Sequence, residues 1–432
     1  MSKSAERVDR VINRLKDAFE TTPHFKSLQE ETDTIPKDDI LLSVIIPARN
    51  EFPNICHTMY SIWHCWEADG FDPNQIEIII VDNCSENWND PKYDWTKPGD
   101  RGTVTYLMPR GAYGDRRWRV HYFPIAGNHA ARNRGARIAR GKYLFISDAH
   151  MAYKPGFFKY GIQATEESGG IVHGGINWMG AYAKDENDSR TGRQYTIKLG
   201  EEWKGTWNSY VPWSNKWFYI PAQGHCSVFV NRKQFLDFGG YPEFHRTYGG
   251  GEFYLNMKWW MYGSSVVAEP RCIGYHLASG RGYTYTHDDY IHNVFNCAYA
   301  LGCDDWLERT YINYLRRGRK EVLDKMMDEA KKEMQSDREL IASRRTKTFN
   351  ELIVEKPWDM KNMERGGAKN SSMLIFHQTW LNLLKQDGGQ ALEAYKNSKH
   401  QKELEDFIMG SLKDYIYKYE EYKDVELQVD EV

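Results

Sequence analysis

The stretch GKYLFISDAHM (141–151) shows the sharpest change of character along the chain. Five residues suited to a buried strand, 143–147, are followed directly by Asp148 and His150. Side chains two positions apart on an extended chain point the same way, so a carboxylate and an imidazole could contact one object. Aspartate is also a common cap or turn residue at strand ends. A divalent metal is the other explanation, and the remaining sequence must distinguish the two.

Two earlier runs have the same form, a wholly apolar strand that ends at polar residues. LLSVIIPARNE predicts a strand over 41–46 that stops at Pro47, and QIEIIIVDNCSEN predicts one over 75–81 that ends on Asp82. Strands that are apolar at every position are typical of a parallel sheet covered on both faces. Asp82 and Asp148 would then lie at the carboxyl ends of strands, where such sheets bind their ligands.

Helical segments separate these strands. Helices are expected over 53–67 and 127–141, and a further strand over 118–123. The alternation indicates an α/β fold with a Rossmann-like, doubly wound and mostly parallel sheet. Further on, HCSVFV (225–230) and SSVVAEP (264–270) predict two short strands.

Three regions follow from the pattern along the chain. Residues 1–40 predict an amphipathic helix and a polar linker, residues 41–304 the α/β domain, and residues 305–432 a charge-rich helical region. No run is apolar and long enough for a signal peptide or a spanning helix, so no membrane association is expected.

Composition excludes several classes of protein. Hydrophobic residues make up 41% of the 432 and aromatic residues 14%, as in a folded globular chain. The net charge of −3 implies no overall attraction to nucleic acid or membranes. Seven cysteines, an odd number without a CxxC pair, indicate reduced thiols and a cytoplasmic location, or the host cytoplasm for a viral protein.

Five stretches, in this order, resemble the nucleotide-sugar glycosyltransferases of the GT-A fold in family 2, and most of all the polypeptide N-acetylgalactosaminyltransferases. They are SVIIPARNE (43–51), IIIVDNCSEN (78–87), ARNRGARIARGKYLFISDAHM (131–151), AQGHCSVFVNRKQFLDFGGYPEF (222–244) and YGGGEFYLNMKWWMYGSSVVAEPRCIGYH (248–276). The resemblance does not reach the C-terminal region. It implies a GT-A fold and transfer of a sugar from a nucleotide-sugar donor, with UDP as the family's usual nucleotide, to a hydroxyl acceptor.

The resemblance also implies the residues of a metal and donor site. Asp148, His150 and His276 would hold a divalent cation, Mn²⁺ or Mg²⁺. A carboxylate with imidazoles suits Mn²⁺ better, because Mg²⁺ prefers oxygen ligands and water. The donor would be bound by Pro47, Ala48, Arg49, Glu51, Asp82, Arg132, Asn133, Trp203, Trp207 and Gly224. The cation would stabilise the negative charge of the departing diphosphate.

Glu252, Asp148 and Arg132 are the residues expected to take part in the chemistry. Inverting relatives carry Glu-Asp where this chain has Glu252 and Phe253, and their aspartate takes the acceptor proton. The retaining N-acetylgalactosaminyltransferases lack that aspartate too, so the resemblance favours retention, with a donor phosphate oxygen taking the proton. Glu252 would then orient the sugar or the acceptor. Alternatively, it is a carboxylate stabilised at a helix N-terminus.

The acceptor is less clearly indicated. From Arg116 to Lys142 there are eight basic residues and no acidic one, and LRRGRK (315–320) and SRRTK (343–347) add further basic clusters. Basic residues near aromatic ones favour a polynucleotide acceptor, although solvated helix faces and donor-phosphate contacts would explain them too. The leading hypothesis is a 5-hydroxymethylpyrimidine base in double-stranded DNA, as in bacteriophage-type enzymes. A saccharide and a protein Ser/Thr hydroxyl are the alternatives.

Two further interpretations stay open at this stage. EEWKGTWNSYVPWSNKW (201–217) holds four tryptophans, which suit stacking on sugars or bases as well as a structural aromatic cluster. The chain could also be a non-catalytic sugar-nucleotide-binding scaffold. The intact set of Asp148, His150 and His276 argues against that reading, because a binder without catalysis would not need all three.

Overall fold

The computed structural model of the chain describes residues 40–51, 54–83, 85, 118–123, 127–179, 196–199, 205–208, 210–212, 216–277, 285–316, 319–358 and 363–365. The predicted N-terminal helix and the helical segments expected after residue 366 lie outside these residues. Within the described ranges, no helix has the length and apolar character needed to cross a bilayer.

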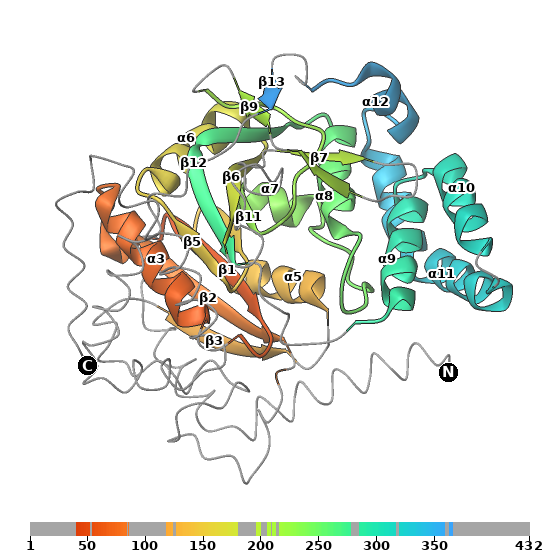
Figure 1. Cartoon of the computed structure of the whole chain (residues 1–432), viewed down its shortest axis with the longest axis horizontal. Coiled ribbons are helices and arrows are strands. Elements are labelled where there is room, and N and C mark those ends of the chain that lie inside the picture. Colours follow the sequence, from red (N-terminus) through yellow and green to blue (C-terminus); the bar gives the residue numbers. More distant parts are fainter. Residues whose placement is uncertain are drawn as a thin grey trace, which may run out of the picture.

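A nine-stranded sheet forms the centre of the molecule (Figure 1). Its strands follow the order β10 (Phe218–Tyr219), β12 (Val266–Leu277), β6 (Ile171–Met179), β11 (Ser227–Asn231), β4 (Tyr143–Ser147), β1 (Leu42–Ala48), β2 (Ile76–Asn83) and β3 (Trp118–Phe123), and β5 (Met151–Tyr153) pairs with β12. The half from β3 to β4 is parallel, as predicted, while β11 runs antiparallel to both of its neighbours. The sheet is therefore mixed, with a Rossmann-like parallel half.

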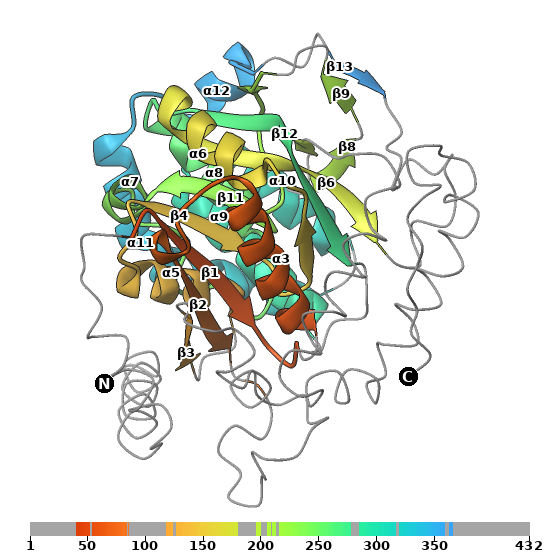
Figure 2. The same cartoon turned by 90° about the vertical axis from the view of Figure 1, so that its left-hand side faces the viewer.

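Helices cover both faces of the parallel half, as its apolar strands predict. α3 (Asn54–Ala68) and α6 (Phe157–Ser168) pack on one face, in the same hydrophobic core as Val44 (Figure 2). α5 (Asn128–Ile138) packs on the other face, in the core that contains Ile45. Neighbouring residues of β1 thus enter opposite cores, and both are fully buried.

β1 extends further than its sequence indicates. The strand was expected to stop at Pro47, but it continues through the proline to Ala48. β4 pairs with β1 only over Leu42–Ile45, so no hydrogen bond from β4 is lost at the proline. Proline is tolerated where a strand has no partner on one side.

β12 also differs from the short strand expected over SSVVAEP. It spans twelve residues and continues past His276. Between Glu269 and Ile273 its register with β6 shifts, and within this bulge Arg271 donates to Glu269 through Nε at 2.8 Å. With this bulge, β12 continues along the whole length of β6. Its far end thereby brings His276 to the carboxyl end of β4.

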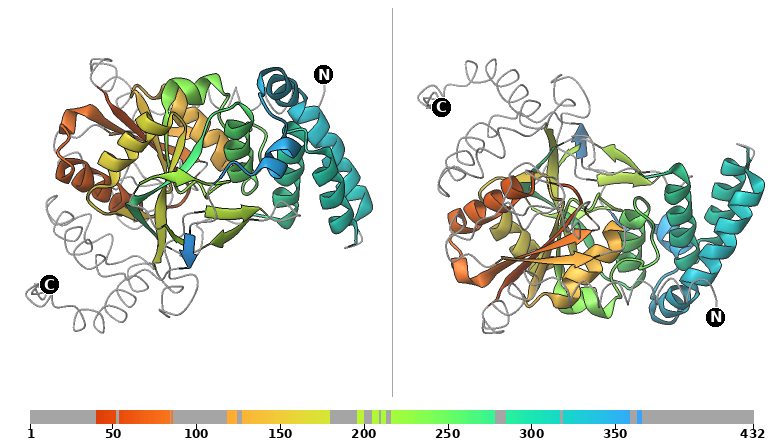
Figure 3. Two further views of the ribbon diagram at one scale, coloured as in Figure 1. Left: turned by 90° about the horizontal axis from the view of Figure 1, so that it is seen from above. Right: turned by 90° about the horizontal axis from the view of Figure 1, so that it is seen from below.

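Helices after β12 gather at one end of the molecule (Figure 3). They are α9 (His287–Ala300), α10 (Asp304–Leu315), α11 (Lys320–Arg344) and α12 (Phe349–Glu355). Their apolar faces share one hydrophobic core with α8 (Gly251–Met261). The helical character expected after residue 305 is confirmed over these ranges, and the domain boundary at that residue stays a prediction.

The other described elements are short. They are η2 (Pro73–Gln75), α7 (Arg232–Asp237), β7 (Thr196–Leu199), β8 (Gly205–Asn208), β9 (Tyr210–Pro212) and β13 (Met363–Arg365). β7 pairs with β8, and β9 pairs with β13. Trp203 lies outside the described residues, and for Trp207 only the backbone, on β8, is described.

Candidate active site

The three predicted metal ligands meet at one edge of the sheet. Asp148 and His150 follow β4, and β5 begins at the next residue. His276 on β12 lies opposite Met151 in the antiparallel pairing of β12 with β5. One ligand atom of each of the three side chains lies within 4.8 Å of the others. This is the only such group of three among the described residues, and its spacing suits a single cation.

A buried threonine holds the turn that carries two of these ligands. The Thr58 hydroxyl of α3 donates to the Ala149 carbonyl oxygen at 2.9 Å and accepts from the Met151 amide at 2.8 Å. The two bonds lie on either side of His150. Asp148 is fixed as well, because its amide donates to the Cys226 carbonyl oxygen at 3.2 Å. The backbone of the ligand turn is therefore anchored to both α3 and the segment before β11.

Asp148 is kept ionised by its neighbours. Arg132 Nη2 of α5 donates to its Oδ1 at 2.8 Å, and His276 Nε2 lies 3.4 Å from its Oδ2. Burial acts to raise the pKa of Asp148, but the hydrogen bond from His276 and the charge of Arg132 outweigh it and hold the pKa well below its ordinary value. The carboxylate is therefore available as a metal ligand at any physiological pH.

The histidines are also prepared for a metal. His150 Nδ1 lies 3.1 Å from Glu51 Oε2, which leaves its other ring nitrogen available to bind a metal. A carboxylate in this position fixes the ring and raises its basicity as a ligand. Burial lowers the pKa of His276, which favours the neutral imidazole that binds metals. Glu51, predicted to line the nucleotide pocket, thus contacts a metal ligand directly.

Asp82 lies at the end of β2, at the same edge of the sheet, and is fully buried. Its Oδ1 accepts from the Ser85 amide at 2.9 Å, and Ser85 Oγ accepts from the Asn50 amide at 3.0 Å. Its Oδ2 has no hydrogen-bond partner among the described residues. Burial raises the pKa of Asp82 to about 7, against the hydrogen bonds from Ser85 and the charge of Arg49. A buried carboxylate oxygen without a hydrogen bond lowers the stability of a folded protein. It suggests that a bound ligand donates a hydrogen bond to this oxygen.

The GGGE stretch forms a tight turn into α8. Gly249 and Gly250 have φ of 104° and 83°, a region that glycine adopts without strain. A Cβ on Gly251 would lie 2.1 Å from His129 Nε2, so a side chain is excluded there. These constraints place Glu252 in the first turn of α8. Both of its readings, substrate contact and helix N-terminal carboxylate, are compatible with this position.

The charges of Glu252 and Asp148 affect the same two side chains, Cys226 and Tyr241. Burial raises the pKa values of the Cys226 thiol and the Tyr241 phenol, and the charges of both carboxylates raise them further. Arg132 lies in this region as well, with its guanidinium 5.6 Å from the centre of the Tyr241 ring and its Nη2 3.2 Å from the His225 carbonyl oxygen. Arg132 and Asp148 are therefore in direct contact, and the charge of Glu252 reaches the same Cys226 and Tyr241 side chains.

Other predicted residues are placed less directly. Pro47 and Ala48 end β1, and Arg49 follows them near Asp82. Gly224 is buried beside the His225 carbonyl that Arg132 contacts. The amide of Asn133 contacts the segment after α7.

Asn133 donates to the Tyr241 carbonyl oxygen at 2.7 Å and to Glu243 at 2.8 Å, and its oxygen accepts from the Tyr241 amide at 2.9 Å. These bonds hold the 241–243 segment in place. Thr58 and Tyr241 were not singled out from the sequence. A hydroxyl or phenol inside an apolar stretch carries no spacing signal that would reveal a partner far along the chain.

Comparison with known proteins agrees with this geometry. Residues 43–226 match the model of glycosyl transferase family 2. The match runs from β1 to the residue before β11 and includes Asp82, Arg132, Asp148 and His150. Residues 43–226 are therefore similar to a glycosyl transferase family 2 domain, and the mixed α/β sheet is a GT-A-like fold.

One solved structure supports the fold. A crystal structure of GalNAc-T7 with UDP, GalNAc and Mn²⁺ aligns at a TM-score of 0.51 and 16% identity, over 71% of this chain and 57% of that one. This chain thus spans little more than half of that chain, and the likeness concerns the fold alone. Two structures of S. aureus TarS 1–349, one with UDP-GlcNAc, align at TM-scores of 0.38 and 0.39 and 12% identity, over 87% of this chain and 89% of theirs. Among curated proteins, no sequence matches this chain.

Proposed function

We propose that this protein transfers a sugar from a UDP-sugar to a hydroxyl acceptor with a divalent metal, Mn²⁺ or else Mg²⁺. The observation that carries the proposal is the triangle of Asp148, His150 and His276 at the carboxyl edge of the sheet, within 4.8 Å of one another. When bound there, the metal would supply positive charge to the departing diphosphate. GalNAc-T7, which shares the fold, has been crystallised with UDP and Mn²⁺.

The side chains present fit this cofactor. Asp148 supplies an ionised carboxylate, and His150 and His276 supply two imidazole nitrogens. Mixed nitrogen and oxygen ligands favour Mn²⁺ over Mg²⁺. The contact of Glu51 with His150 provides the outer carboxylate that commonly orients a metal-bound histidine.

The nucleotide would occupy the ends of β1 and β2. Asp82 Oδ2, which lacks a hydrogen-bond partner in the described part of the chain, would accept from a base N–H or a ribose hydroxyl. Pro47, Ala48 and Arg49 would form the adjoining wall. Trp203, Trp207 and Gly224, the other donor contacts expected from the sequence, remain part of the proposal.

Arg132 and Glu252 are assigned the chemical roles. Arg132 is 4% exposed and already contacts Asp148, so its charge lies where the donor phosphates would meet the metal ligands. Asn133 would support it by holding the 241–243 segment. Glu252 would orient the sugar or acceptor, and the absence of an aspartate at Phe253 favours retention of the anomeric configuration.

Most of the described residues in the basic run that suggested a DNA acceptor form ion pairs within the protein. Arg119 and Arg140 lie 3.3 and 2.7 Å from the buried Glu77 of β2, and Lys142 lies 3.2 Å from Glu166. Arg137 pairs with Glu243. Such side chains are less available to phosphates, and a saccharide acceptor therefore gains relative to a hydroxymethylated base in DNA.

Three residues of the later basic clusters are ion-paired as well. Arg319 contacts Asp288, with Nη2 2.7 Å from Oδ2, and Lys320 lies 2.5 Å from Asp324. Lys347 pairs with Glu355. A DNA acceptor would have to be bound by other basic residues of the chain, and it is kept as the second candidate on the sequence evidence alone. The cytoplasm remains the proposed compartment, on the cysteine pattern.

A donor-by-acceptor screen tests the proposal. Mass spectrometry would follow UDP-sugars with simple glycans, hydroxymethylated duplex DNA and Ser/Thr peptides, with Mn²⁺ present. We expect slow hydrolysis of at least one UDP-sugar without acceptor, abolished by chelator, and transfer to a glycan. If no UDP-sugar is turned over under any condition while one still binds, the protein is a non-catalytic sugar-nucleotide binder.

A further inference from the structure

A second pocket, of about 640 Å³, lies where β6 and β12 begin, whereas the metal ligands lie toward the other ends of these strands. It opens where α6 ends at Ser168 and where β12 begins after Ser265. Ile171 and Trp178 of β6 pair with Val266 near the pocket and with His276 at the metal site. At about 3.3 Å per residue along β6, these two places are about 23 Å apart. The pocket is therefore separate from the donor site.

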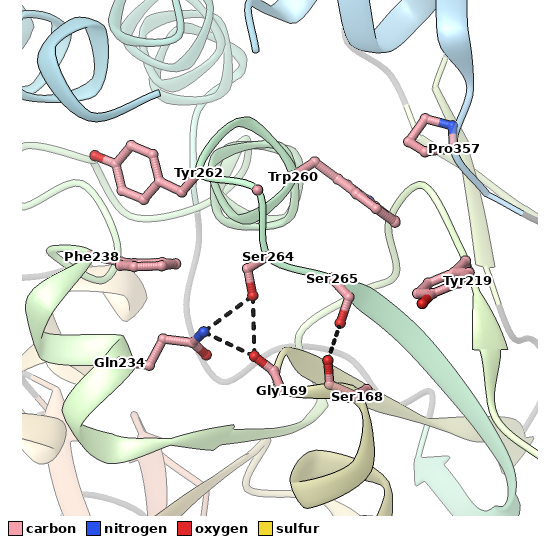
Figure 4. Close-up of a pocket in the computed structure, with 11 residues that line it drawn as sticks. Ser168, Gly169, Tyr219, Gln234, Phe238, Trp260, Tyr262, Ser264, Ser265 and Pro357 are labelled. Atoms are coloured by element: carbon pink, nitrogen blue, oxygen red, sulfur yellow. Dashed lines mark hydrogen bonds between the residues drawn. The ribbon is translucent and has the colours of Figure 1, made fainter. Parts of the chain in front are cut away.

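Aromatic rings form two of its walls. Figure 4 shows Phe238 and Tyr262 on one side of Ser264, and Trp260 and Tyr219 on the other. The Phe238 and Tyr262 ring centroids are 4.7 Å apart, and those of Tyr219 and Trp260 are 5.8 Å apart. The second pair continues to Trp217, 5.5 Å from Tyr219, and to Trp358, 6.1 Å from Trp260. Such flat apolar faces suit the C–H faces of sugar rings.

The polar groups between the rings can still accept hydrogen bonds. Gln234 Nε2 donates to the Gly169 carbonyl oxygen at 2.9 Å and to Ser264 Oγ at 3.1 Å, and Ser264 Oγ lies 3.2 Å from the same carbonyl (Figure 4). Ser265 Oγ donates to the Ser168 carbonyl oxygen at 2.9 Å. Each of these two serine hydroxyls has used its proton and keeps acceptor capacity, so a ligand with O–H or N–H donors complements them.

Charge narrows the class of ligand further. None of the described residues that line the pocket is charged. A nucleotide or nucleic acid would also stack on the rings, but its phosphates would find no Lys or Arg in the lining. A purely apolar ligand would leave the serine and glutamine acceptors without water or donors.

From the aromatic walls and the uncharged acceptor floor, we infer that this pocket binds a neutral saccharide. The site goes beyond the transfer reaction: it would hold a stretch of glycan chain remote from the metal, as an anchor for acceptor or product. The inference does not depend on the identity of the donor, since it rests only on the lining residues.

Titration calorimetry on the full chain tests the inference. Neutral oligosaccharides of glucose, N-acetylglucosamine and N-acetylgalactosamine would be titrated with EDTA and without UDP, so that the metal site cannot contribute. We expect binding by at least one of them, weakened roughly tenfold or more by Tyr219→Ala or Phe238→Ala. Tyr219→Phe should retain binding, and so should Tyr160→Ala, which alters a tyrosine outside the pocket that packs against Arg271. Thermal melting would confirm that each variant is folded.

Three outcomes would overturn the inference. The first is that no saccharide binds, which includes the case that residues 366–432 of the chain itself occupy the pocket. The second is equal binding by the pocket variants and the Tyr160→Ala control. The third is tighter binding of an oligonucleotide than of any saccharide. Loss of UDP-sugar turnover with intact saccharide binding would count against the proposed reaction alone.

Discussion

His276 Nε2 lies 3.4 Å from Asp148 Oδ2, although the two residues belong to distant parts of the chain. The contact exists because β12 runs along the full length of β6 and then pairs with the three-residue strand β5, immediately after the Asp148 turn. Folding of the long strand therefore completes the candidate metal site. The predictions below follow from this arrangement.

Removing the third ligand should weaken metal binding. In His276→Ala, a site with two protein ligands remains, and we expect Mn²⁺ affinity to fall at least tenfold, with a parallel loss of UDP-sugar hydrolysis. Calorimetry with Mn²⁺ measures the first effect. His64→Ala, a change at an exposed histidine of α3, is the matched control and should behave as wild type. Equal Mn²⁺ affinity in both variants would contradict the assignment.

The Thr58 hydroxyl should matter more for the metal site than its small size suggests. Thr58→Val keeps the shape but leaves the Ala149 carbonyl and the Met151 amide without this partner. We expect a loss of about 1–3 kcal/mol in the free energy of unfolding, and weaker Mn²⁺ binding. Thr165→Val in α6 is the control, because among the described residues that buried hydroxyl bonds only within its helix, to the Gly161 carbonyl at 2.7 Å. Urea titration and calorimetry would separate the two effects, and unchanged metal affinity would reduce Thr58 to a structural role.

Asp82 should make stability fall as pH rises. Its pKa of about 7 in the folded chain lies above the ordinary value of 3.8, so folding takes up a proton between these values. The free energy of unfolding, measured relative to that of Asp82→Asn, should therefore decrease by about 4 kcal/mol between about pH 4 and about pH 7. Urea titrations at several pH values measure this difference. A flat difference between the two proteins would show that the carboxyl titrates normally.

Donor binding should show the opposite dependence. The ionised Asp82 only accepts hydrogen bonds, at both oxygens, whereas in the protonated form one oxygen carries a proton and acts as a donor. KM for the UDP-sugar should thus fall as pH rises through about 7, and Asp82→Asn should have a higher KM without this dependence. A pH-dependent KM that persists unchanged in Asp82→Asn would rule out this residue as the nucleotide contact.

Glu252 should affect turnover without setting the stereochemistry. If it orients substrate, Glu252→Gln lowers kcat at least tenfold, and the product keeps the anomeric configuration of the donor sugar. Glu355→Gln, at an exposed carboxylate of α12, is the control. NMR of the product would report the configuration. Near-normal turnover would leave Glu252 as a helix N-terminal carboxylate, and an inverted product would remove the retention hypothesis.

Much of the parallel half of the sheet could be predicted from local pattern. Continuous apolar runs identified β1, β2 and β4, because both of their faces are covered by helices and every position must be buried. The same runs ended at Asp82 and Asp148, which placed both at the functional edge. The resemblance to a known family, and no spacing rule, supplied His276.

The rest depended on contacts between distant segments. The long β12 could not be predicted because its bulge at Glu269 interrupts the apolar pattern. The basic run before Lys142 looked like a nucleic-acid surface, but its partner Glu77 lies inside an apolar strand far along the chain. Pairing of this kind is a property of the fold, and the local sequence does not reveal it.

The most direct test of the metal site is a crystal of the full chain grown with MnCl₂ and UDP, with anomalous data collected at the manganese edge. The account predicts one strong peak about 2.2 Å from an oxygen of Asp148 and a ring nitrogen of each of His150 and His276, with the diphosphate bound to the same ion. A peak elsewhere, or UDP bound at this edge with the three side chains turned away from any ion, would contradict it.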